Sequence, residues 1–183
     1  MLFLLFSCSL GNFQSRHSSD LGVRNIKRIA ILPSDPILNN PLYSTMAALP
    51  DWHIVSDREV REVGALVPQG DARTRAKKLG ELVYADAVIF GQVLRYHERV
   101  GEEWGAKSPA SVAFVLDLWD VRRGDLIWSG SFDETQRPLS DNILAIGEFT
   151  QRGGKWLRAE ELALEGIKKA VNQLHQTLYR SAA

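Results

Sequence analysis

The chain has 183 residues, 45% of them hydrophobic, which is enough for one domain with a substantial core and too few for two. Its 22 basic and 22 acidic side chains cancel, so no net charge draws it toward nucleic acid or an anionic bilayer surface. A charged fraction of 24%, with five Trp and seven Phe, is typical of a folded domain. The composition therefore predicts one folded domain without a nucleic-acid partner.

An apolar run opens the chain and ends at its single cysteine, Cys8. The small Ser7 precedes this cysteine, and residues 5–8 resemble the lipobox, at which a bacterial signal peptide is cleaved and the cysteine acylated. The run is too short for a transmembrane helix, which needs about 20 apolar residues. The alternative is an apolar N-terminus with a chance cysteine. The lipobox interpretation predicts that residues 1–8 are a truncated signal peptide and that Cys8 carries the lipid.

Acylation of Cys8 would leave no thiol for a disulfide, a metal site or nucleophilic catalysis, because the chain has no other cysteine. Several acyl chains hold a protein stably on a membrane. As the lipoprotein resemblance implies, Ser9 after the cysteine favours the outer membrane, with the domain facing the periplasm. Residues 9–26 are polar without apolar periodicity, which predicts a flexible tether before a globular domain in residues 27–183.

Apolar periodicity in residues 27–183 predicts an α+β (α/β) domain. The expected strands cover residues 29–32, 52–55, 87–98, 111–121 and 126–132, and the expected helices cover residues 42–49, 57–64, 72–82 and 159–178. The last three strands form an antiparallel meander, in which Gly124 supplies the positive φ of a tight hairpin. The long C-terminal helix has one apolar stripe and should pack across the sheet.

This order of elements behind a lipobox resembles the envelope lipoproteins with a domain like the N-terminal domain of TolB. Curli-secretion-type lipoproteins and activators of penicillin-binding proteins are among them. Residues 29–33, 85–91 and 123–130 carry the resemblance, which covers residues 27–178. It implies a single mixed sheet with helices packed on it, and a periplasmic adaptor.

Motifs for catalysis or cofactor binding do not occur in the sequence. Neither GxGxxG nor GxxxxGK is found, and the four histidines show no HExxH spacing. Asp117 and Asp120 lie three apart on a predicted strand, so they point to opposite faces, and Asp120 fits better as a support for the turn at Arg123. We therefore predict no catalytic residue, no cofactor and no metal site. A hydrolase with a dispersed active site is the less favoured alternative.

A basic cluster lies on the helix predicted at residues 72–82 and comprises Arg73, Arg75, Lys77 and Lys78. We interpret it as a solvated helix face. The alternative is phosphate binding, which is disfavoured because no Gly-rich loop precedes the cluster to supply convergent backbone amides.

Two tryptophans, Trp104 and Trp156, lie in predicted loops among charged residues or glycines. Aromatic side chains often anchor protein interfaces, so both are candidate partner-binding residues, with Arg123 and Arg152 beside them. The alternative is that both rings fold back onto the core. The sequence thus predicts a membrane-anchored, non-catalytic adaptor that binds an envelope protein in cell-wall synthesis or secretion. A structural subunit of a homo-oligomeric outer-membrane assembly is the other interpretation.

Overall fold

A six-stranded mixed sheet forms the centre of the computed structural model, which describes residues 13–32, 34–102, 105–136 and 156–179. The strand order is β1-β8-β7-β4-β2-β3, in which β2 is parallel to β3 and β4 and all other neighbours are antiparallel. The strands are β1 (Phe13–His17), β2 (Arg28–Leu32), β3 (His53–Ile54), β4 (Ala87–His97), β7 (Ser111–Asp120) and β8 (Leu126–Thr135). The predicted α+β class and the antiparallel β4-β7-β8 meander are confirmed.

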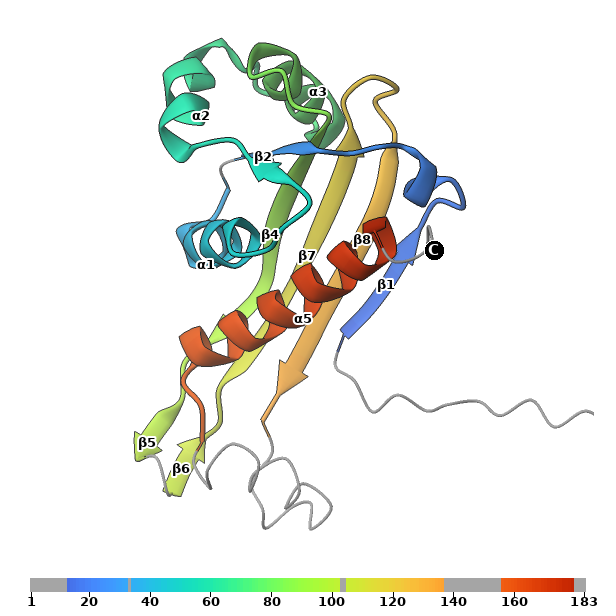
Figure 1. Cartoon of the computed structure of the whole chain (residues 1–183). Coiled ribbons are helices and arrows are strands. Elements are labelled where there is room, and N and C mark those ends of the chain that lie inside the picture. The colour runs from blue at the N-terminus through green and yellow to red at the C-terminus, as the bar shows by residue number, and fades with distance from the viewer. Residues whose placement is uncertain (1–12, 33, 103–104, 137–155, 180–183) are drawn as a thin grey trace, which may run out of the picture.

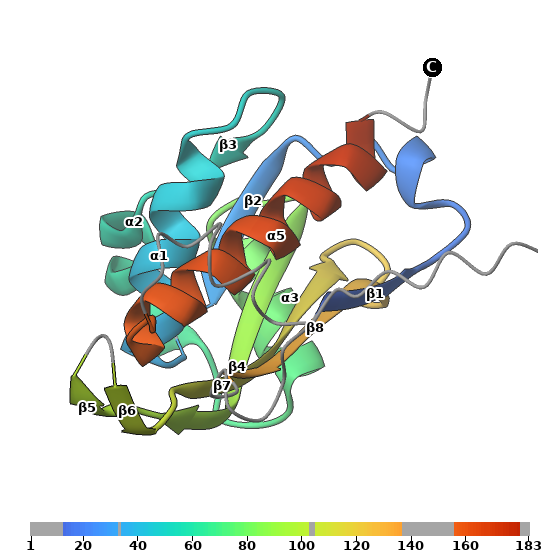
Figure 2. The same cartoon turned by 90° about the horizontal axis from the view of Figure 1, so that it is seen from below.

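Helices lie on both faces of this sheet (Figures 1 and 2). One face packs against α1 (Pro36–Ala47) and α5 (Ala159–Tyr179), and the other against α2 (Asp57–Val63) and α3 (Ala72–Leu82). Strand β4 shows the division, since Ala87 and Ile89 belong to the larger hydrophobic cluster under α5 whereas Val88 belongs to the smaller one under α3. Side chains that alternate along one strand thus contribute to two hydrophobic cores, one on each face of the sheet.

The predicted apolar stripe of α5 is confirmed, with Ile167 and Leu174 fully buried against the sheet. A glycine on that stripe lets the helix come close to β8. A Cβ atom at Gly166 would lie 2.7 Å from the ring of Phe132, closer than carbon atoms approach. The Phe132 ring therefore occupies the space that a side chain at position 166 would need.

The face that carries α2 and α3 is only partly covered (Figure 1). These helices pack on β2 and β4, while β8 and β1 present polar side chains on the same side. Gln14, Arg16 and Ser131 are exposed there, and Phe132 next to them is buried on the opposite side. This half of the sheet is amphipathic, as antiparallel sheets with one solvated face usually are.

Residues 13–26 differ from the sequence-based expectation of a flexible tether. Strand β1 pairs with β8, the Phe13 ring stacks on Trp128 at 6.4 Å, and Leu21 in the 3-10 helix η1 (Leu21–Val23) is buried. The edge of β8 offers backbone hydrogen bonds whatever the side chains are, so a polar segment can extend the sheet. The tether interpretation does not hold for these residues, and the expectations for residues 1–12 lie outside the described ranges.

Helix α1 begins six residues before the predicted start at residue 42. The Asp35 carboxylate accepts a hydrogen bond from the Ile37 amide at 2.9 Å, and Pro36 occupies the first helical position, where it needs no hydrogen-bond partner. Pro41 lies inside the helix, which is unfavourable in isolation. Packing of the buried Leu38, Leu42 and Met46 against the sheet outweighs that cost.

A buried arginine, Arg24, joins the N-terminal segment to the β7–β8 hairpin. Its side chain is 6% exposed and lies 3.0 Å from Asp20, 3.1 Å from Asp120 and 2.8 Å from Asp125. Hydrogen bonds from this guanidinium hold the pKa values of the Asp20 and Asp125 carboxyls below their usual range. Asp120 also accepts a hydrogen bond from the Arg123 amide, so its expected role as a support of the turn is confirmed.

We expect Arg24→Met to lower the free energy of unfolding by about 3 kcal/mol, because it leaves Asp120, which is 5% exposed, without its charge partner. Chemical denaturation followed by circular dichroism measures the effect. Arg123→Ala is the matched control: that side chain is 64% exposed in its pair with Asp20 and should cost less than about 1 kcal/mol. An equal decrease in the free energy of unfolding in the two variants would contradict the larger contribution expected of the buried pair.

Candidate functional site

An arm projects from one end of the sheet, beyond the helices (Figure 1). It consists of the end of β4, the hairpin of β5 (Val100–Glu102) and β6 (Gly105–Ser108), and the start of β7. The β4–β7 pairing ends at His97 and Ser111, and the hairpin is a separate two-stranded sheet that begins at Val100 and Ser108. We call residues 94–102 and 105–111 the arm.

A β-bulge lies at the base of the arm, and its extra residue is a large, exposed apolar side chain. In the pairing of β4 with β7, Val93 lies opposite Phe114 and Arg95 lies opposite Ala113, so Leu94 is an extra residue without a partner. Leu94 is 60% exposed, and Val100 further along the arm is 58% exposed. The arm thus presents two aliphatic groups to solvent.

Polar contacts stiffen the arm around the bulge. Arg95 donates hydrogen bonds to the Ser111 hydroxyl and to the Asp133 carboxylate. The Ser111 and Thr135 hydroxyls lie 2.7 Å apart in a hydrogen bond between β7 and β8. These contacts tie β4 to β7 and β8 beside Leu94, so the exposed leucine lies on an ordered strand.

Trp156 lies where the arm meets the start of α5. The Arg99 guanidinium donates a hydrogen bond of 2.8 Å to the Trp156 carbonyl oxygen, and the Glu98 carboxylate accepts one of 3.2 Å from the Ala159 amide. Trp156 is partly buried. The structure therefore places one predicted partner-binding residue beside the arm.

Tyr96 and the acidic side chains near it set the electrostatics of this region. Burial raises the pKa of the Tyr96 phenol, and the carboxylates of Glu98 and Glu160 raise it further. The phenol therefore stays neutral and able to donate a hydrogen bond at physiological pH. Nothing in this chemistry resembles a nucleophile paired with a base.

The other predicted site residues do not gather at the arm. Arg123 lies at the opposite end of β7, where its guanidinium is 3.0 Å from Asp20, so it has an intramolecular partner. Cys8, Trp104 and Arg152 lie outside the described residues. Sequence reasoning missed Leu94, since an apolar residue in a strand pattern is assigned to the core unless the bulge is known.

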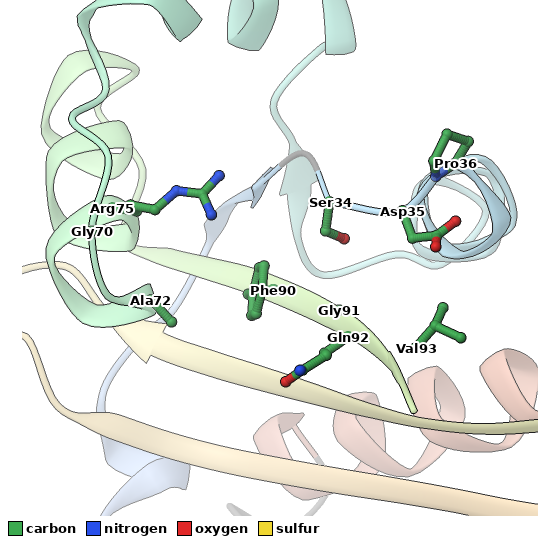
Figure 3. Close-up of a pocket in the computed structure, with 10 residues that line it drawn as sticks. All are labelled: Ser34, Asp35, Pro36, Gly70, Ala72, Arg75, Phe90, Gly91, Gln92 and Val93. Atoms are coloured by element: carbon green, nitrogen blue, oxygen red, sulfur yellow. The ribbon is translucent and has the colours of Figure 1, made fainter. Parts of the chain in front are cut away.

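The basic cluster of α3 does not act as a unit. Arg73 and Lys77 lie beside Gly124 of the β7–β8 hairpin, whereas Arg75 points to a cleft on the other side of the helix (Figure 3). Among residues 13–32, 34–102, 105–136 and 156–179, no three His, Cys, Asp or Glu side chains lie close enough to hold a metal ion. In the same ranges, no helix is both long and apolar enough to cross a bilayer.

Comparison with known proteins gives similarity of structure without similarity of sequence. No protein-family model matches the chain, and no curated protein matches it significantly in sequence. The chain is similar to the PelC dodecamer from Paraburkholderia phytofirmans, with 16% identity over 88% of this chain and 95% of that one and a TM-score of 0.45.

Two further solved structures belong to the same comparison. Lipoprotein GNA1162 from Neisseria meningitidis is 20% identical over 69% of this chain and 92% of that one, with a TM-score of 0.44. The LpoB C-terminal domain from Salmonella enterica is 15% identical over 61% of this chain and 84% of that one, with a TM-score of 0.44.

We expect Leu94→Ala to change the free energy of unfolding by less than about 0.5 kcal/mol, because the side chain is already in solvent. The same substitution at the fully buried Leu116 in β7 should cost about 2 to 5 kcal/mol. Urea denaturation of both variants checks the pair. A loss at Leu94 comparable to that at Leu116 would show that Leu94 belongs to the core.

Proposed function

We propose that this chain is a lipid-anchored envelope protein, held to the membrane through Cys8, that binds another envelope protein through the arm and catalyses no reaction. The observation that supports the arm as the binding surface is the bulge at Leu94. There an exposed leucine lies on a strand that is paired with β7 along one edge and is tied to β7 and β8 through the Arg95 side chain.

An exposed aliphatic side chain on a preordered strand loses little conformational entropy when it binds. Val100, further along the arm, is a second exposed aliphatic side chain, and Arg95, next to Leu94, pairs with Asp133. An apolar centre with a polar rim is the usual arrangement of a protein interface. Trp156 stays a candidate anchor at the base of the arm, and Trp104, which follows β5 in the sequence, stays a candidate beside it.

The anchor is supported by the sequence: an apolar run, the small Ser7 and the single Cys8. The outer membrane, the periplasmic orientation and the choice between cell-wall synthesis and secretion belong to the same proposal. The TolB-like character of the domain also remains a prediction.

A second candidate is a structural subunit of a homo-oligomer, favoured by the edge strand β1. Within the described residues, β1 hydrogen-bonds to β8 on one side and to no other strand on its other side. Free strand edges are templates for pairing with another chain, and an identical copy would present the same edge.

We expect Cys8→Ser to move the chain from the membrane fraction to the soluble fraction of bacterial cells without changing its unfolding curve. The hydroxyl cannot be processed as a lipobox cysteine, while residue 8 lies outside the described fold. Ser9→Ala keeps the cysteine and serves as the control that should remain on membranes. Persistent membrane association of the Cys8→Ser protein would exclude the lipid anchor.

We expect a photo-crosslinking amino acid at position 94 to capture an envelope protein in living cells, identified by mass spectrometry. The matched control is position 58 on α2, where the Arg side chain is 86% exposed but lies away from the arm. A crosslink to a different protein at position 94 alone supports the adaptor, and a crosslink to a second copy supports the homo-oligomer. The same products at both positions, or none at position 94, would reject the arm as the interface.

A further inference from the structure

A cleft of about 520 Å³ opens at the point where β2 ends and β4 continues (Figure 3). Its floor is residues 90–93 of β4, one wall is residues 34–36 at the start of α1, and the other wall is the start of α3 with Arg75. The volume is in the range of small-ligand sites. Ligands of open α/β sheets commonly bind at the carboxyl ends of parallel strands, where this cleft lies.

The Arg75 guanidinium has no partner in the part of the chain that the structure describes. Its Nε atom is buried from solvent and makes no hydrogen bond, whereas Arg24 and Arg28 both pair with carboxylates. Figure 3 shows the side chain reaching from α3 over Phe90 toward the segment of Ser34 and Asp35. The outer nitrogens of this guanidinium line the cleft without a carboxylate partner among the described residues, and an anionic group bound there would pair with them.

The opposite wall is acidic. Asp35 Oδ1 accepts the Ile37 amide, while Asp35 Oδ2 accepts no hydrogen bond from any described residue. The next amides of α1, those of Leu38 and Asn39, already donate to the Asp35 carbonyl oxygen. This wall therefore presents a negative charge and no free amide donors, so it repels a dianionic phosphate and favours a positively charged donor.

The floor between the two charges is mixed, with the apolar Phe90 and Val93 and the polar Gln92 on β4 (Figure 3). Gly91 lies in this floor. A Cβ atom there would lie 3.0 Å from the Leu38 side chain and 3.1 Å from the Leu116 side chain, so the backbone packs closely on these core residues. The cleft thus has a cation on one wall, an anion on the other and room for a small hydrocarbon group between them.

We propose that this cleft binds a free amino acid or short peptide, with its carboxylate on Arg75 and its ammonium group toward Asp35. A small apolar side chain of the ligand lies over Phe90. Opposite charges on the two walls fix the direction of the ligand, because reversing it would place like charges together. The site adjoins the base of the arm, because its floor residue Val93 precedes Leu94, but the proposal does not depend on the adaptor function.

Isothermal titration of the full chain with alanylalanine tests the proposal. We expect saturable binding at one site, weakened about tenfold by acetylation of the dipeptide amine or by amidation of its carboxylate. Arg75→Gln should weaken binding by a similar factor. Arg73→Gln, on the same helix but beside the hairpin, should leave it unchanged.

Asp35→Asn tests the acidic wall without removing the helix cap, because Asn caps helices as well as Asp does. We expect weaker dipeptide binding and an unchanged unfolding curve. Absence of saturable binding at millimolar dipeptide, or equal binding by the Arg75→Gln and Arg73→Gln proteins, would overturn the proposal. Binding of inorganic phosphate as tight as that of the dipeptide would also overturn it, because Asp35 should exclude a dianion.

Discussion

The unequal length of two neighbouring strands determines most of this structure. Strand β2 has five residues and β4 has eleven, and their pairing ends where Leu32 lies opposite Phe90. Beyond that point β4 has β7 on one side and no strand of the described chain on the other. The overhang forms the floor of the cleft and then, a few residues further on, the arm. The cleft and the arm are therefore two results of one mismatch.

The other end of β7 is stabilised by charge. Arg24 contacts carboxylates of the η1 turn and of both sides of the β7–β8 hairpin, and these contacts exist together only when the N-terminal segment lies against the hairpin. Strand β1 then follows the free edge of β8. A buried arginine stabilises one end of the sheet, and the other end extends into solvent. The residues that stabilise the fold are therefore separate from those proposed to bind a partner.

Patterns of apolar residues were sufficient to predict β2, β4, β7, β8, α3 and α5, since each has a continuous or periodic apolar face that must be buried. Strand β1 could not be predicted in this way, because it pairs with the backbone edge of β8. Its position is also stabilised by Arg24, which contacts a hairpin about a hundred residues away in the sequence. The start of α1 was hidden by Pro36 and Pro41, which look like loop residues until Asp35 is recognised as a cap.

The site was less predictable than the fold. The partner-binding role of Trp156 stays a prediction, and the structure adds that this residue lies at the base of the arm. Leu94 was not singled out, because an apolar residue within a predicted strand is assigned to the core. Arg75 was grouped with three other basic residues of α3. Only the helical geometry separates it from Arg73 and Lys77, which are four apart and share one side.

The position of β1 also limits how far the domain can move from a membrane. Phe13 begins the strand only five residues after Cys8, and an extended chain spans about 3.4 Å per residue, so the reach is roughly 17 Å. Phe13 pairs with Phe132, toward the arm end of β8. With Cys8 acylated as proposed, the arm would work close to the lipid headgroups. It would meet partners by lateral diffusion in two dimensions, and proteins confined to the same leaflet would be encountered far more often than soluble ones.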